Sequence, residues 1–170
     1  MERTKWIDRK FTFDISPGWM SYILERLIGT EIRLYAITTS LMEEQLIFQQ
    51  QNAWSIKQHI GHLNDLEELH DGRIDDFLAR KQILRAADMN NEKTQKAGHN
   101  SKNLTDLMND FKLLRNHFTN RLTHLDDDTQ MLQSLHPRLK VMMRPVDMAF
   151  FTAEHDDFHI AMIRGIINQF

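Results

Sequence analysis

The stretch AEHDDFHI, residues 153–160, carries His155 and His159 four residues apart. If this stretch is helical, both imidazoles lie on one face with Cβ atoms about 5–6 Å apart, close enough to bind one cation together. A metal site needs at least one more ligand. We infer that His62, near the start of another expected helix, supplies it. The rest of the chain must then form a fold that brings these two helices together.

Length and composition fit one soluble domain, residues 1–170, which can bury a core without a covalent staple. The chain has no cysteine, which excludes disulfides, thiolate metal sites and a cysteine nucleophile. Its charged first five residues are followed by no apolar signal region, and no apolar run approaches the ~18 residues of a membrane span. We expect a cytoplasmic protein with no membrane partner.

The charge pattern argues against several classes of ligand. The net charge is −3, and acids and bases are interspersed, so no basic face is available to a nucleic acid. The six glycines are scattered and form no phosphate-binding loop. Asp126, Asp127 and Asp128 lack the spacing, the glycine and the final glutamate of a calcium loop. We interpret these three acids as a solvated turn.

Apolar residues that recur at three- and four-residue steps predict four helices and therefore an all-α fold. The helices are expected at about residues 17–46, 55–80, 103–125 and 145–168. Pro17 and Pro145 suit the first turn of a helix, and Ser55 with Gln58 matches a capping box. The last helix is apolar on nearly every side, so we expect it to be central or covered by another subunit.

Two segments lie outside the expected helices. Residues 1–15 carry aromatic and aliphatic side chains in a loosely alternating order, which predicts an extended N-terminal arm that packs on the body. Residues 81–102 are polar, rich in asparagine and without a period. A connection of this length inside a compact domain is usually a crossover, a lid or a functional loop.

The histidine pair has an ordinary structural alternative. Nine histidines give about 0.4 pairs at i,i+4 spacing by chance, and two histidines at the edge of a core can bond to backbone carbonyls or carboxylates instead. Flanking acids can orient metal-bound imidazoles, a role that we assign to Asp156. His59 is a rival third ligand on spacing alone. Arg73 lies about 16 Å along the helix from His62, so we expect it to pair with another helix. The remaining histidines are expected at the surface: His70, His99, His117, His124 and His136.

Several motifs together resemble the DinB/YfiT-like superfamily. The stretch WSIKQHIGHLNDLE, residues 54–67, is similar to the second-helix signature of that family, and EHDDFH, residues 154–159, to its last-helix signature. Residues 85–111 resemble its linker and third helix. RLIGT at 26–30 and HPR at 136–138 fit as well. The resemblance spans nearly the whole chain.

This resemblance implies a four-helix bundle, often a homodimer, with a long crossover linker between the second and third helices. It implies a divalent metal held by His62, His155 and His159. His59 falls where the family usually has an apolar residue, which argues against it as a ligand. Zinc and nickel are the first candidates for the metal, with manganese and iron as alternatives.

The family includes transferases and isomerases that use low-molecular-weight thiols such as bacillithiol or mycothiol. Three neutral imidazoles leave a coordination position where a divalent ion can activate water for hydrolysis or a thiol for transfer. We therefore expect a metal-dependent small-molecule enzyme, either a thiol-dependent S-transferase or a related transferase or hydrolase. The alternative is a non-catalytic bundle that binds metal for stability or serves as a stress-response binding module.

Overall fold

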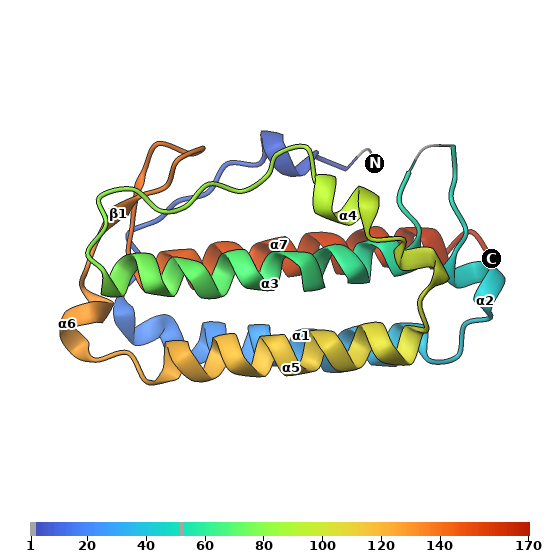
Figure 1. Cartoon of the computed structure of the whole chain (residues 1–170), viewed down its shortest axis with the longest axis horizontal. Helices are drawn as coiled ribbons and strands as arrows, with labels where there is room; N and C mark the ends of the chain where they lie inside the picture. The colour runs from blue at the N-terminus through green and yellow to red at the C-terminus, as the bar shows by residue number, and fades with distance from the viewer. Residues whose placement is uncertain (1–2, 52) are drawn as a thin grey trace.

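The computed structural model describes residues 3–51 and 53–170. Four long helices form a bundle (Figure 1): α1 (Met20–Thr38), α3 (Ile56–Leu78), α5 (Leu104–Thr123) and α7 (Pro145–Ile167). The connections hold short elements: η1 (Trp6–Asp8), η2 (Pro17–Trp19), α2 (Glu43–Leu46), α4 (Glu92–Lys96), η3 (His99–Ser101), α6 (Asp127–Gln130), and an antiparallel hairpin of β1 (Ser134–Leu135) and β2 (Met142–Met143). No helix in the described ranges combines the length and apolar character that crossing a membrane requires.

Each long helix packs against two others. Helices α1 and α5 form one layer and α3 and α7 the other, and α1 also packs on α7 as α3 does on α5 (Figure 1). Helices α1 and α7 run in one direction and α3 and α5 in the opposite one (Figure 1). Of the helices that follow one another along the chain, α1 and α3 are diagonal in the bundle, as are α5 and α7, whereas α3 and α5 pack side by side in parallel. Helix α3 lies antiparallel to α7.

The helix starts follow the signals in the sequence. Ser55 caps α3: its Oγ accepts a hydrogen bond from the backbone N of Gln58, whose side chain accepts one from the backbone N of Ser55. The first helix is shorter than the predicted 17–46, because α1 ends at Thr38. The cause is local, since residues 37–40 are Ile, Thr, Thr and Ser, which favour the helical state weakly. Leu41 and Leu46 still reach the core, so the apolar period continues past the break.

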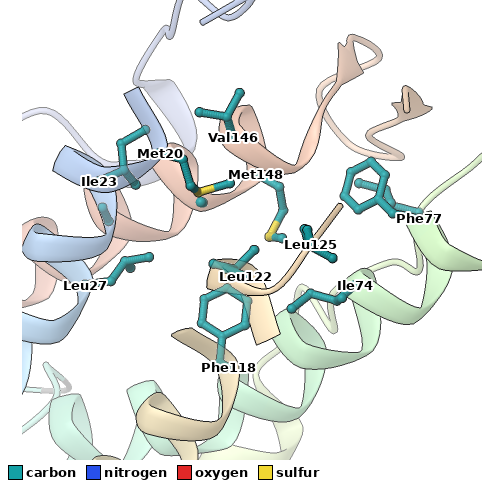
Figure 2. Close-up of a cluster of buried hydrophobic side chains, with 13 residues drawn as sticks. Met20, Ile23, Leu27, Ile74, Phe77, Phe118, Leu122, Leu125, Val146 and Met148 are labelled. Carbon is teal, nitrogen blue, oxygen red and sulfur yellow. The ribbon is translucent and has the colours of Figure 1, made fainter. Parts of the chain in front are cut away.

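Two apolar clusters fill the bundle. Figure 2 shows the first, in which side chains from all four long helices meet: Met20, Ile23, Leu27, Ile74, Phe77, Phe118, Leu122, Leu125, Val146 and Met148. The second fills the other end and is formed mainly by Leu34, Leu46, Ile56, Ile60, Leu63, Leu107, Met108, Phe111, Ile160 and Ile163.

A polar layer separates the two clusters and links all four long helices. Arg115 of α5 is 1% exposed and donates to Glu67 of α3, at 2.6 Å, and to Asp156 of α7. It also donates to the carbonyl of Leu27 in α1, and Thr30 donates to Asp156 at 2.8 Å. Burial opposes the charge of the guanidinium, but the carboxylates of Asp156 and Glu67 raise the pKa of Arg115 above its ordinary value. Because one guanidinium bonds to carboxylates on two helices and to a carbonyl on a third, this layer fixes how the helices face one another.

The N-terminal arm, residues 3–15, and the connection between α3 and α5 both run over the outer side of the α3–α7 layer (Figure 1). Asp76, which is fully buried, holds the connection by accepting hydrogen bonds from the backbone and the guanidinium of Arg85. Two glycines of α3 allow this close approach: a Cβ at Gly61 would overlap the ring of His99, and one at Gly72 would overlap Arg85. The arm and the connection thus cover the helix pair that carries the paired histidines.

Candidate metal centre

His62 of α3 meets His155 and His159 of α7. All three are buried, and each offers one ring nitrogen such that the three atoms lie within 4.8 Å of one another. The Nε2 atoms of His155 and His159 are 3.2 Å apart. Two nitrogens bound tetrahedrally to one zinc ion, at about 2.0–2.1 Å each, are separated by about 3.3–3.4 Å. The pair on α7 therefore has the spacing of two ligands of a single ion.

Thr94, in the connection between α3 and α5, fixes the orientation of His62. Its hydroxyl donates to Asp65 at 2.8 Å, and the same hydroxyl oxygen lies 3.0 Å from Nδ1 of His62. Because the only hydroxyl proton is already given to Asp65, Nδ1 of His62 must be the donor of the second bond. Nε2 of His62 then keeps its lone pair. His99 also bonds to Asp65, at 2.8 Å, and completes the support of this ligand.

His59 is a neighbour of the cluster. Its Nδ1 lies 2.8 Å from Nδ1 of His159, and the group of converging nitrogens does not include it. This hydrogen bond holds a single proton, so one of the two rings is the donor and the other is the acceptor. When His159 donates it, Nε2 of His159 is free as a lone pair facing His155. We therefore assign His59 to orienting His159.

His155 is positioned by packing. The ring of Trp6 from the N-terminal arm meets its ring edge-on, with centroids 4.9 Å apart. Its Nδ1 is buried and has no hydrogen-bond partner among the described residues. Neither His155 nor His159 bonds to a backbone carbonyl or a carboxylate in that part of the chain. The contacts of ordinary core histidines are thus missing here.

The electrostatics keep these rings neutral. Burial and the neighbouring histidines lower the pKa of His62 to about 3 and that of His59 to about 4. Burial and the charge of Arg115 lower the pKa of His155 to about 3, and burial keeps the pKa of His159 well below its ordinary value. Neutral imidazole is the form that binds a metal, so the cluster needs no deprotonation at pH 7.

The expected role of the flanking acids is wrong. Asp156 points into the bundle, where it accepts from Arg115 and Thr30. Glu154 and Asp157 form ion pairs on the other side of α7, with Arg9, Arg26 and Arg33. The sequence could have indicated Asp65, because it follows His62 by three residues and so lies on the same face of the helix. Nothing in the sequence indicated Thr94, because the connection that carries it has no periodic pattern. Three histidines expected at the surface are buried instead: His70, His99 and His136.

The three histidines form part of the wall of a cavity of about 840 Å³ between the helices, the arm and the connection. Apolar side chains make up most of the lining: Trp6, Trp54, Leu66, Leu69, Phe151, Phe158 and Met162. Among the described lining residues, the sole carboxylate is Asp88, whose oxygens accept from the backbone of Asn90 and Glu92. A volume of this order accepts a small organic molecule.

Comparisons with known proteins agree with the fold of the chain. The sequence model of the DinB superfamily matches residues 26–163. Among solved structures, the chain is similar to YfiT from Bacillus subtilis, with a TM-score of 0.81 and 18% sequence identity over 95% of this chain and 93% of the other. That protein is described as a probable metal-dependent hydrolase with an unusual four-helix bundle topology. No significant match was found among curated proteins.

Proposed function

Because the chain belongs to the DinB superfamily, as the match over residues 26–163 shows, we propose that it is a divalent-metal-dependent enzyme acting on a small molecule. His62, His155 and His159 are the proposed ligands. The observation that carries the proposal is the convergence of their ring nitrogens on the wall of a large cavity. Zinc and nickel suit three imidazoles best among the candidates, with manganese and iron as alternatives.

A divalent ion held there supplies Lewis acidity, which lowers the pKa of a water molecule or thiol that binds to it. The chain's own residues hold and orient the ligands. Thr94 keeps the proton of His62 on Nδ1, and His59 receives the Nδ1 proton of His159, so both Nε2 lone pairs are available. Trp6 and Trp54 cover the histidines and limit the access of bulk water. The dry surroundings strengthen any charge interaction in the site.

Two nucleophiles are compatible with this site. Water is favoured by the description of YfiT as a probable metal-dependent hydrolase, and a low-molecular-weight thiol is favoured by the thiol-using relatives that the motifs resemble. The cavity is large enough for an organic substrate with either nucleophile. We therefore propose hydrolysis first and thiol-dependent S-transfer second.

A metal that serves stability alone has less support. Two apolar clusters and the paired charges around Arg115 already join the four helices. The histidines lie to one side of these contacts, on the cavity wall. A structural ion is most useful where a small core cannot hold the fold, which is not the situation here.

A panel of assays separates these possibilities. The full chain, loaded with zinc, nickel or manganese, is tested on activated esters and on thiols paired with an electrophile such as chlorodinitrobenzene, with His155→Ala and His159→Ala as matched variants. Turnover that follows metal content supports an enzyme, and the substrate class that reacts identifies the nucleophile. A large fall in melting temperature on chelation, with no turnover on either class, would support the structural role instead.

A homodimer is part of the proposal as well. Helix α1 exposes large apolar side chains on one face, among them Ile28, Ile32 and Tyr35. Light scattering of the full chain and of Ile32→Glu tests whether this face is an interface. We expect the variant to shift the chain toward the monomer.

A further inference from the structure

Arg73 is a buried cation that forms no ion pair with any carboxylate of the described residues. Its side chain lines the cavity and is 3% exposed. Its Nε and Nη2 donate to the backbone carbonyl of Arg85, at 3.3 and 3.2 Å. Among the described residues no carboxylate lies within ion-pair distance, so the predicted pairing with another helix is wrong. A buried guanidinium without a counter-charge is costly, and a ligand can supply that charge.

A second guanidinium, that of Arg138, lines the same cavity. Arg138 lies over the ring of Phe151, with its Cζ 5.8 Å from the ring centroid, and it too forms no ion pair with any residue that the structure describes. Burial lowers the pKa of Arg73 to about 10; the charge of Asp76 opposes this shift, and the charge of Arg138 adds to it. Arg73 and Arg138 thus line one cavity, in which the single carboxylate among the described lining residues, Asp88, is already bonded to backbone.

His136 adds a hydrogen-bond donor beside them. Its Nδ1 accepts from the backbone N of Leu139 at 3.2 Å, which places the proton of the neutral ring on Nε2. Nε2 is buried and has no partner among the described residues, although the side chain lines the cavity and is only 3% exposed. Its ring centroid is 5.5 Å from that of Phe151, so it lies at the same level of α7 as Arg138.

We infer that Arg73, Arg138 and Nε2–H of His136 form a binding site for the anionic group of the substrate, a carboxylate or a phosphate ester. Phe151 is one helical turn before His155, so the site begins about 5–6 Å along α7 from the histidine cluster. Leu66 and Leu69 line the cavity and offer apolar surface to the rest of the molecule. The substrate is thus an amphiphilic organic anion. The claim that the reacting group of this substrate reaches the metal rests on the proposed function. The anion site itself does not depend on it.

Calorimetry of the full chain with octanoate and with octyl phosphate tests this site, with octanamide as the neutral probe. We expect one of the two anions to bind at least tenfold more tightly than octanamide, and the better anion shows whether the site suits a carboxylate or a phosphate. Arg138→Met and Arg73→Lys should weaken anion binding about 10- to 100-fold and a few-fold, respectively. Arg164→Met, an exposed arginine of α7 outside the cavity, is the matched control and should leave affinity unchanged.

Each titration is run with zinc-loaded and with chelated protein, and the metal content is measured separately. Anion affinity that persists after chelation supports the site even if the chain proves not to bind metal. Anion binding that requires metal and survives Arg138→Met would overturn it, because the anion would then be a metal ligand. Equal affinity for octanoate, octyl phosphate and octanamide would overturn it as well. Melting curves of each variant confirm that the fold is intact.

Discussion

Thr94→Val removes one hydroxyl from the contact that orients His62 and keeps the volume of the side chain nearly constant. In the native chain that hydroxyl accepts from Nδ1 of His62 at 3.0 Å and donates to Asp65 at 2.8 Å. The valine leaves the buried Nδ1 proton without an acceptor, so His62 is free to turn or to change tautomer. Asp65 keeps its bond to His99. The variant therefore disturbs one proposed ligand and little else.

Loss of a partner that orients a metal ligand typically weakens metal affinity 10- to 100-fold, or about 1.4–2.7 kcal/mol. A buried donor left without an acceptor costs about 1–3 kcal/mol of folding stability. For a chain of this size that corresponds to a fall of about 3–9 °C in melting temperature. Zinc affinity is measured by competition with a chromophoric chelator, and stability is measured by thermal unfolding of the metal-free chain.

Thr38→Val is the control for Thr94→Val. Thr38 is equally buried, but its hydroxyl donates only to the carbonyl of Leu34 in its own helix. It should lose some stability and no metal affinity. Zinc binding by Thr94→Val within twofold of the native chain would refute the assignment of this hydrogen bond to the metal site.

Three further predictions follow from the same contacts. His59→Ala should keep one ion per chain with weaker affinity, whereas His159→Ala should lose it; elemental analysis showing the reverse would make His59 the ligand. The pKa of His136 and His155 is lowered to about 3 in the folded chain, so between about pH 6.5 and 3 the unfolded chain binds more protons. The metal-free chain should lose about 1.4 kcal/mol per pH unit for each such histidine as pH falls, and urea unfolding that is independent of pH from 7 to 5 would contradict this. Asp156→Asn should cost about 1–3 kcal/mol in urea unfolding, because it weakens the hydrogen bonds from Arg115 and Thr30 while Glu67 still neutralises the guanidinium. The metal content of this variant should be unchanged. A loss of metal would instead indicate that Asp156 supports the metal ligands.

The helices and the three candidate ligands could be predicted because both depend on local periodicity. The i,i+4 relation of His155 and His159 places the two rings on one face of the last helix, however that helix packs. The apolar stripe of residues 56–77 places His62 at the edge of the face that turns toward the core. The family resemblance chose between His62 and His59, which spacing alone left open. The match to the DinB superfamily confirms that resemblance.

The groups that support the ligands could not be predicted in the same way. Thr94 reaches His62 from a connection without a period, and its position depends on the bond between Asp76 and Arg85 some ten residues earlier. The sequence places Asp156 beside both histidines, but a buried arginine on another helix turns it inward. Such contacts depend on tertiary packing, which cannot be deduced from the spacing of residues in the sequence.

The most direct test of the central claim is the metal content of the purified full chain and of His62→Ala, His155→Ala and His159→Ala, each dialysed against the same zinc buffer. If the three rings bind one ion together, the native chain holds one zinc per chain and each variant holds close to none while keeping its helical circular dichroism. Unchanged zinc in the folded variants, or a native chain that takes up no divalent ion, would contradict the account.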